Sequence, residues 1–456
     1  MSNFKAATLV SSLLFLVSTY SVAQGPCPVA TSLTQNVSLS SDLVCAIPQV
    51  YGSGGLVGTN HGGPLVVVTN PPHEVHFQAS SLQSLTPLNA EIGTQLSQLP
   101  ITSPASGFVF SFNPSLGVVS RSTETFGPIL AERADTIGKH KLFLGVSYQY
   151  FDFNKADGVD LRSFGTVYTH ATPAPDTVKD DIIATNNRID LKVHQVTLVG
   201  TFGITNRLDV SLAIPVVDVR MGFSSDASIF TKESPAVHQF ASPAPDPSHE
   251  TFLAADHALF FNHNSAFGIG DLIVRGKFQA LKREKVGLAA GIDFHIPTGN
   301  EENFLGSGTF GARPFVTFSY SGRISPHATL GYQINGNSIL AGDITKGTEA
   351  HLPNILTYSA GADAGITRRL SVALDFLGQA LQDAKTIASS TFTDFNGTPR
   401  ASLTSSAATI NQASIAVGGK VNPIGKLLLT ANVLFRINDA GLHSKPAPLV
   451  GISYTF

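Results

Sequence analysis

Hydrophobic and polar residues alternate along the chain from Lys141 onward, in stretches of about ten residues separated by breaks. One stretch, LFLGVSYQY, places every second residue on an apolar face: Leu142, Leu144, Val146, Tyr148 and Tyr150. A period of two residues indicates a β-strand, because successive side chains of a strand point to opposite sides of its sheet. Stretches of this kind predict an all-β fold of about 12 antiparallel strands.

The breaks between these stretches alternate between short and long. The short ones cover residues 205–207, 282–285, 321–323, 367–369 and 422–425, and the long ones cover residues 154–185, 224–262, 335–353 and 382–406. Bacterial outer-membrane barrels have short periplasmic turns and longer extracellular loops. The alternation therefore predicts a transmembrane β-barrel over residues 139–456, surrounded by the lipid of a bacterial outer membrane.

The last six residues, GISYTF, place Ile452, Tyr454 and Phe456 on one face. Backbone groups in hydrocarbon must all be paired, so strands there close into a barrel without an edge. We therefore expect this strand to pair with the first one, near residues 142–150, and to turn its aromatic face to lipid. A terminal aromatic strand also resembles the signal by which the outer-membrane assembly machinery recognises its clients. We assign that signal to Tyr454 and Phe456.

Composition narrows the class of protein further. Charged side chains make up 13% of the 456 residues, against roughly 25% in soluble domains. The net charge is -3, and no Lys or Arg lies between Lys5 and Arg121, so a nucleic-acid-binding surface is excluded. A soluble β-sandwich or lectin-like fold is the alternative, because alternation alone fits it as well. The absence of Trp is unusual for a barrel, whose interfacial girdles are aromatic; Tyr and Phe replace it here.

The first 23 residues have the pattern of a secretory signal peptide. Lys5 precedes the apolar run AATLVSSLLFLV, and the small residues SVA end at Ala23. The run is too short to cross a bilayer as a helix, and no later stretch approaches the roughly 20 apolar residues that a membrane helix needs. Residues 1–23 are therefore expected to be cleaved after export.

Two cysteines, Cys27 and Cys45, lie close together in the exported chain. An oxidising compartment favours a disulfide between them, with a pair of free thiols as the alternative. Neither interpretation implies catalysis. No spaced set of Cys and His indicates a zinc site, and we expect neither a metal nor a cofactor.

Residues 24–138 form a segment unlike the repeated strands. Its first part has the composition of loops. Thr86 and Pro87 then predict the start of a short helix that ends at Pro100. This helix places Leu88, Ile92, Leu96 and Leu99 on one face. GFVFSF and GVVSRS predict short strands. Because this segment precedes the first barrel strand, we expect a plug inside the lumen or a cap beneath the barrel, and its low charge favours the plug.

Several motifs resemble those of one known family. TFGPILAERADTIG, NRLDVSLAIP, GIGDLIVRGKF and GIDFHIPTGNEENFLGSGTF, with the terminal aromatic residue, resemble an outer-membrane family labelled for the MetA pathway of phenol degradation. The resemblance runs from about Thr125 to Phe456. It rests on Gly268, Gly270 and Asp271 and on Pro297, Thr298 and Gly299, at strand ends. It implies a porin-like or transporter barrel that handles aromatic compounds, and it carries no catalytic residues to this chain.

Polar residues opposite the apolar faces are expected to line the lumen. The candidates are Asp271, Arg275, Lys277, Asp293, His295, Arg313, His327, Asp375 and Arg436. One interpretation is a polar conduit that selects solutes by charge. The other is a ladder of ion pairs and hydrogen bonds that fills a narrow barrel.

These features together predict a non-enzymatic outer-membrane channel or transporter for the passive passage of small solutes, aromatic or hydrophobic compounds included. No GxSxG elbow, carboxylate pair or phosphate-binding loop occurs, so an outer-membrane hydrolase is the weaker alternative. An adhesin or receptor that acts through the long loops, or a purely structural barrel, is the other. The sequence leaves the oligomeric state and the identity of the solute open.

Overall fold

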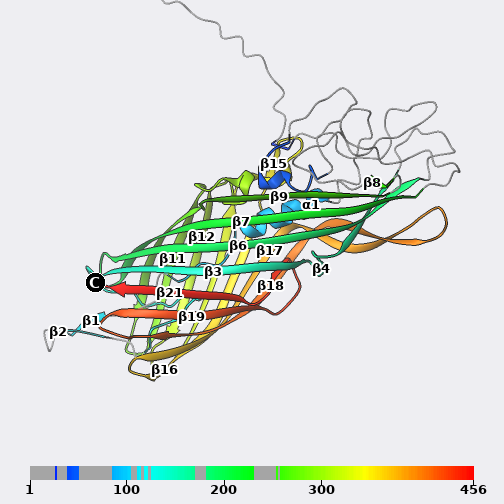
Figure 1. Ribbon diagram of the computed structural model, residues 1–456. Helices are drawn as coiled ribbons and strands as arrows, with labels where there is room; N and C mark the ends of the chain where they lie inside the picture. The colour runs from blue at the N-terminus through cyan, green and yellow to red at the C-terminus, as the bar shows by residue number, and fades with distance from the viewer. Residues whose placement is uncertain are drawn as a thin grey trace, which may run out of the picture.

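The computed structural model describes residues 26–27, 39–50, 85–103, 110–113, 118–121, 125–169, 181–230, 253–254 and 257–456. Its main body is one closed antiparallel β-barrel, with the first and last strands side by side (Figure 1). The predicted signal peptide lies outside the described residues. No helix among the described residues is long and apolar enough to cross a membrane.

Twelve strands form the barrel, which confirms the predicted fold class and strand number. In chain order they are β3 (Leu142–Ala156), β6 (Ile182–Gly203), β7 (Leu208–Phe230), β9 (His257–Ile269) continued by β10 (Leu272–Lys282), β11 (Val286–Ile296), β12 (Gly311–Tyr320), β13 (Ile324–Asn335), β16 (Ile355–Thr367), β17 (Leu370–Thr393), β18 (Pro399–Val421), β19 (Leu427–Arg436) and β21 (Ala447–Thr455). The barrel closes through β21 and β3, where Tyr454 lies opposite Leu144. The last strand thus pairs with the first, as the terminal residues predict.

Shorter elements lie at the two ends of the barrel and before it. They are η1 (Leu43–Cys45), α1 (Leu85–Leu96), β1 (Phe110–Asn113), β2 (Val118–Arg121), β4 (Val159–Asp160), β5 (Phe164–Thr169), β8 (Leu253–Ala254), η3 (Glu301–Asn303), β14 (Asn337–Asp343), β15 (Thr348–His351) and β20 (Leu442–Ser444). The predicted helix and both predicted short strands are present. The helix starts before Thr86 and ends at Leu96, so Thr86 is not its cap and Leu99 lies beyond it.

Short turns and long loops lie at opposite ends of the barrel. Residues 204–207, 283–285, 321–323, 368–369 and 422–426 make the short turns. The C-terminal residue Phe456 is at the same end, where its N–H donates to the carbonyl oxygen of Leu142. In outer-membrane barrels the short turns face the periplasm. This end is called the short-turn end below, and the other is the long-loop end.

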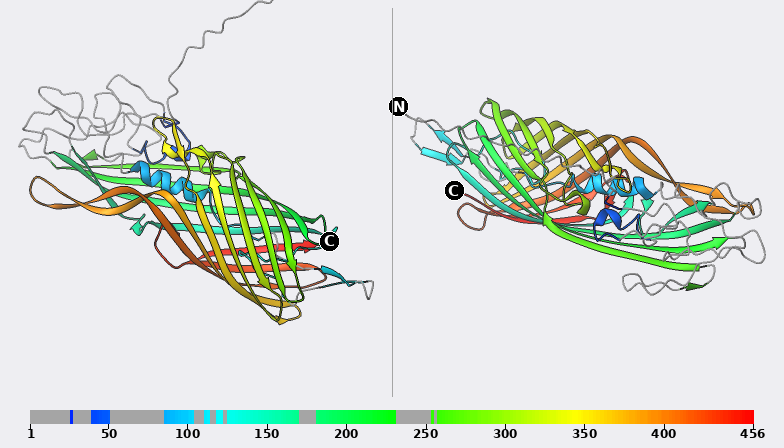
Figure 2. Two further views of the ribbon diagram at one scale, coloured as in Figure 1. Left: turned by 180° about the vertical axis from the view of Figure 1, so that it is seen from behind. Right: turned by 90° about the horizontal axis from the view of Figure 1, so that it is seen from above.

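Two of the predicted loops are largely strand. Most of residues 382–406 forms a long hairpin of β17 and β18, whose ladder reaches Thr393 opposite Pro399. Residues 224–230 and 257–262 likewise extend β7 and β9. Residues 382–406 are rich in Ser, Thr and Ala and lack the regular apolar alternation by which lipid-facing strands are identified. In the other two segments, the apolar residues Ala258 and Phe260 are buried inside the barrel. The loop predictions were wrong for these residues. Both hairpins reach far beyond the shorter strands of the barrel (Figure 2).

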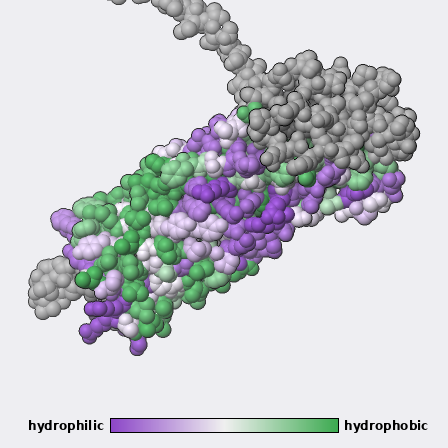
Figure 3. Space-filling model, in the orientation of Figure 1, coloured by the Kyte–Doolittle hydropathy of each residue, from purple (hydrophilic) through white to green (hydrophobic). Residues whose placement is uncertain are grey.

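The apolar side of the barrel wall changes along β6. Toward the short-turn end, Leu198 and Phe202 face outward and are 42% and 44% exposed. Figure 3 shows apolar surface over the part of the barrel nearest the short turns. Toward the long-loop end, Leu191 and Val193 are fully buried and face the interior. An apolar face turns to lipid inside the bilayer and to a protein core outside it. The prediction that apolar faces point to lipid therefore holds for only part of the barrel.

A bulge at Gly270 separates β9 from β10. In the register, Ala213 and Val216 of β7 lie opposite Ile273 and Ile269, so two residues of β7 span the same length as three of the other strand. The extra residue reverses which side chains point inward along the rest of the strand, Arg275 included. A Cβ atom at Gly270 would lie 3.0 Å from the carbonyl oxygen of Leu305, and glycine allows this close approach.

Candidate functional site: the lumen and its N-terminal segments

Residues 125–138 lie inside the short-turn end of the barrel, directly before β3. Their backbone N–H groups donate hydrogen bonds of 2.9 to 3.4 Å to inward-facing side chains: Phe126 to Ser371, Ala131 to Asp375, Ala134 to Ser319 and Ile137 to Asp209. These side chains belong to three strands, β7, β12 and β17. The segment therefore contacts several sides of the lumen at once.

Lys420 of β18 attaches this segment to the wall through its backbone. Its Nζ atom donates hydrogen bonds of 2.5 to 3.1 Å to the carbonyl oxygens of Phe126, Gly127 and Pro128. The side chain is almost completely buried. Burying an ammonium group is costly unless its three donors are satisfied, and here the backbone of residues 126–128 satisfies them.

A buried cluster of charged groups connects the same segment to β10. Glu132 accepts hydrogen bonds from Lys277, at 3.0 Å, and from Arg275. Lys277 also donates to the carbonyl oxygens of Arg133 and Asp135. Burial alone raises the pKa of Glu132, but the charges of Lys277 and Arg275 outweigh it and hold this pKa below its ordinary value. Glu132 is therefore a carboxylate that both cations of β10 require.

Asp293 of β11 extends this charged cluster along the wall. It forms two hydrogen bonds of 2.6 and 2.8 Å with Arg275, and Arg313 of β12 donates to it as well. The Phe315 ring lies below both guanidinium groups, at 4.9 Å from Arg275 and 5.9 Å from Arg313. Each of these two arginines thus has a carboxylate partner.

A second buried group involves His327 of β13. Its Nε2 atom is 2.8 Å from Asp375, and its Nδ1 atom is 3.4 Å from Asp363. Asp375 also accepts the N–H of Ala131 from the N-terminal segment. The charged wall is therefore connected to residues 125–138 on both sides of the lumen.

Residues 97–103 follow the wall in the middle of the barrel. The carbonyl oxygen of Pro100 accepts a hydrogen bond from Gln195, and the hydroxyl groups of Thr102 and Ser147 lie 3.1 Å apart. The N–H of Ser103 donates to the carbonyl oxygen of Ile129 at 2.9 Å. Residues 85–103 and 125–138, called the lumen segments below, therefore contact each other inside the barrel.

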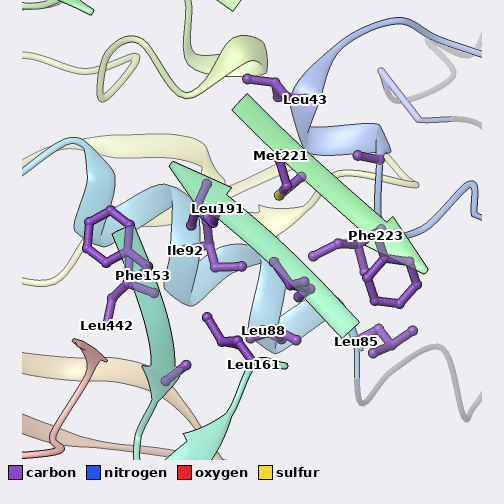
Figure 4. Packing of buried hydrophobic residues seen from close by; sticks show 14 of the residues in the cluster. Leu43, Leu85, Leu88, Ile92, Phe153, Leu161, Leu191, Met221, Phe223 and Leu442 are labelled. Atoms are coloured by element: carbon purple, nitrogen blue, oxygen red, sulfur yellow. The ribbon is translucent and has the colours of Figure 1, made fainter. Parts of the chain in front are cut away.

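Helix α1 lies inside the wall toward the long-loop end. Leu88 and Ile92 are fully buried in one cluster with residues of β3, β6 and β7, among them Phe153, Leu191 and Phe223 (Figure 4). Burying such side chains contributes roughly 1.5–3 kcal/mol each. The apolar interior of this half of the barrel is thus filled by the helix rather than by solvent.

The polar residues of α1 are held against the long-loop end as well. Gln95 accepts hydrogen bonds from the side chain of Gln412 and from the N–H of Leu442. Glu91 is buried and accepts a hydrogen bond from Gln95 at 3.2 Å. Burial raises the pKa of Glu91 well above its ordinary value, and the nearby carboxylate of Asp157 raises it further. This helix is thus bound most tightly when Glu91 is protonated.

A cavity of about 270 Å³ remains in the middle of the lumen. Residues 95–103 line one side of it, and Phe151, Phe153, Leu377 and Leu434 contribute apolar wall. Arg275, Asp293, His295, Arg313 and Arg436 contribute charged and polar wall. Among the described residues, no group of three or more His, Cys, Asp or Glu side chains is arranged to hold a metal ion.

Comparison with known families gives one match. Residues 186–393 match the model of the family described as "Putative MetA-pathway of phenol degradation". The resemblance predicted from the sequence is confirmed. The family match covers the wall from β6 to the end of β17, and it therefore includes the charged residues of β10, β11 and β12. No curated protein matches the sequence.

Solved structures of outer-membrane proteins are similar in fold to this chain. The COG4313 outer membrane channel from Pseudomonas putida F1 has 11% identity and a TM-score of 0.44, over 71% of this chain and 98% of that chain. A Pseudomonas aeruginosa FadL homologue has 11% identity and a TM-score of 0.31, over 78% and 98%. The Ralstonia pickettii toluene transporter TbuX has 12% identity and a TM-score of 0.26, over 71% and 92%. These similarities concern the β-barrel fold alone.

The structure places the nine candidate lumen residues on the inner side of the barrel wall. Asp293 and Asp375 are almost completely buried, whereas Arg313 and Arg436 remain half-buried at the cavity. Asp271 is bound by the loop before β12, because its carboxylate accepts the N–H groups of Gly299 and Ser307. Cys27 and Cys45 form a disulfide. Tyr454 and Phe456 face outward, with ring centres 4.7 Å apart.

Sequence reasoning missed the partners that the N-terminal segment supplies. Glu132 stands in the motif TFGPILAERADTIG, and its charge within a segment almost free of charge was the available signal. Lys420 stands at an inward position of the strand ASIAVGGKV, next to a short turn. Alternation identifies inward residues, but it cannot show that the facing group is a backbone carbonyl of another segment.

Proposed function

We infer that this protein is an outer-membrane channel for small solutes, and that its lumen segments are a plug that must move before solutes pass. The observation that carries this proposal is the binding of Lys420 to three backbone carbonyls of residues 126–128. Hydrogen bonds to the backbone of another segment do not neutralise any charge of the barrel wall. The hydrogen bonds hold a segment that is distinct from the barrel.

The organisation of the chain follows from this proposal. Residues 24–138 supply the plug, residues 139–456 form the barrel, and residues 1–23 direct export as a cleaved signal peptide. A plug that enters before the first strand approaches from the periplasm, where the short turns lie. The partners are then outer-membrane lipid, the assembly machinery and the solute. The activity is passage through the lumen and not catalysis.

The cavity supports small solutes with an apolar part. Its 270 Å³ exceed the roughly 150 Å³ of a cavity that holds benzene. Phe151, Phe153, Leu377 and Leu434 offer apolar contact, and the opposite wall is charged. The family description names phenol degradation, and aromatic compounds are therefore among the solutes that we propose for the channel.

Single-channel conductance in planar bilayers tests the plug and the channel together. We expect the full chain to open rarely, and the variant Lys420→Met to open more often because its segment 126–128 has lost three hydrogen bonds. The matched control is Lys282→Met, which removes an exposed lysine at the short-turn end and should leave conductance unchanged. If a folded Lys420→Met variant is as silent as the full chain, and solute entry into liposomes is equally absent, the channel proposal fails.

A further inference from the structure

Arg436 is the exception among the arginines of the cavity. It lies on β19, and its guanidinium group donates to neutral acceptors alone: Gln412 at 3.2 Å, Ser414 at 3.4 Å and the carbonyl oxygen of Ala440 at 2.8 Å. Its Nε atom is buried and has no hydrogen-bond partner among the described residues. None of the described residues places a carboxylate within ion-pair distance of it.

The arginines on the opposite wall of the cavity do have carboxylate partners. Arg275 and Arg313 share the carboxylate of Asp293, and Arg275 also binds Glu132. A half-buried guanidinium without an anion retains an unsatisfied preference for one, because amide and hydroxyl acceptors compensate its charge only in part. Arg436 therefore has an open position for a carboxylate at the cavity.

The surroundings of Arg436 indicate what else the anion must carry. Leu434 precedes it by two residues on the inner face of β19, and Leu377, Leu442 and Phe153 line the same cavity. Apolar wall beside a single cation suits a molecule with a carboxylate at one end and an apolar body at the other. A small inorganic anion gains nothing from these side chains.

We propose that the lumen cavity binds a small organic monocarboxylate, with its carboxylate on the guanidinium of Arg436 and its apolar body against Leu377, Leu434 and Leu442. The proposal rests on the channel function above and adds the chemical class of one solute. The carboxylate pairs with the guanidinium in place of the neutral acceptors. Neutral aromatic solutes of the same size lack this interaction and bind more weakly.

Isothermal titration calorimetry of the purified full chain tests the site with benzoate and with benzyl alcohol, its uncharged counterpart. Benzoate is expected to bind saturably at one site, at least about tenfold more tightly than benzyl alcohol, because hydrogen bonds between charged groups are stronger than those to a neutral hydroxyl group. Both titrations are repeated in Lys420→Met, where the plug is loosened and access is easier. Equal affinity for the two compounds, or no benzoate binding in either protein, overturns the proposal.

Substitutions assign the binding to Arg436. Arg436→Gln should weaken benzoate binding about tenfold or more, Arg436→Lys should retain most of it, and Arg400→Gln, which removes an arginine paired with Asp394, should leave it unchanged. Full benzoate affinity in folded Arg436→Gln refutes the site. Conductance by Lys420→Met without benzoate binding refutes this site and leaves the channel standing. Benzoate binding without conductance or solute flux keeps the site and refutes the channel.

Discussion

The Nζ atom of Lys420 lies 2.9 Å from the carbonyl oxygen of Gly127, although 293 residues separate the two along the chain. The lysine belongs to a barrel strand and the glycine to the segment that precedes the barrel. The buried ammonium group loses its hydrogen-bond acceptors if residues 126–128 leave their position. The stability of the barrel wall therefore depends on where that segment lies.

Loss of the Lys420 attachment should expose the segment to protease. In Lys420→Met we expect trypsin to cleave after Arg133, which is 4% exposed in the intact protein, because the peptide bond can then leave the lumen. Cleavage is measured by mass spectrometry of the folded protein in detergent. Lys282→Met is the control. Equal resistance of both variants over the same digestion time would show that Lys420 does not hold residues 126–128.

Removal of the Glu132 charge should loosen the same segment from the other side. Glu132→Gln leaves Lys277 and Arg275 buried with fewer carboxylate oxygens, and breaking a buried pair in this way costs about 3–5 kcal/mol. Backbone N–H groups of residues 125–138 should then exchange with deuterium about a hundredfold faster or more. Hydrogen–deuterium exchange mass spectrometry measures this change.

The control for that measurement is Glu284→Gln, which removes an exposed carboxylate from a short turn. A double variant, Glu132→Gln with Lys277→Met, removes a cation together with its partner and should recover part of the protection. Exchange in Glu132→Gln that equals exchange in Glu284→Gln would contradict the assignment of Glu132 as an anchor.

Binding of α1 should weaken as the pH rises. Glu91 has a raised pKa in the folded protein, so the docked helix holds a proton that an undocked helix releases near the ordinary glutamate value of 4.5. The stabilisation is complete below that value and is lost as the pH rises through the raised pKa. Glu91→Gln should remove this dependence. Exchange of residues 85–96, corrected for the intrinsic effect of pH, measures it, and identical pH profiles in both proteins would refute it.

Phe456 should matter for assembly in the cell more than for stability. Phe456→Ala removes the terminal aromatic ring, and we expect less folded protein in the outer membrane but unchanged refolding into detergent micelles. The control is Phe435→Ala, which removes another outward-facing ring, on β19. The folded fraction is measured by heat-dependent migration on gels. A loss in both assays, or in neither, would contradict the role of Phe456 as an assembly signal.

Much of the barrel follows from the sequence because lipid imposes a simple pattern. Leu144 and Tyr454 alternate with small or polar neighbours, and short turns recur at one end, so the strands, their pairing and the closure of the barrel could be predicted. The pattern fails where lipid is absent. In β6 the apolar residues turn inward at Leu191 and Val193, and in the long hairpin of β17 and β18 the apolar residues Ile387 and Leu403 are buried as well.

The sequence predicted the residues that the barrel wall contributes to the candidate site, but not those of the lumen segments. Alternation places Arg275, Asp293 and Arg436 on the inner wall, but it does not distinguish a paired cation from an unpaired one. It also misses Glu132, a further partner of Arg275 that lies 143 residues from it along the chain. Contacts between the barrel and a separate segment depend on how deep that segment lies in the lumen and on which wall residues it then faces. Neither leaves a periodic signal in the sequence.

A reversible cross-link can show whether the lumen segments must move for solutes to pass. The hydroxyl groups of Thr102 and Ser147 lie 3.1 Å apart, so the pair Thr102→Cys and Ser147→Cys can form a disulfide between the lumen segments and the wall. The pair is introduced into Lys420→Met, and Lys420→Met alone serves as the control for reduction of the native Cys27–Cys45 disulfide.

Single-channel conductance is recorded before and after a reducing agent is added. We expect the oxidised cross-linked protein to be silent, reduction to restore the openings of Lys420→Met, and the control to conduct throughout. Equal conductance of the oxidised and reduced cross-linked protein would show that solutes pass without movement of residues 97–103.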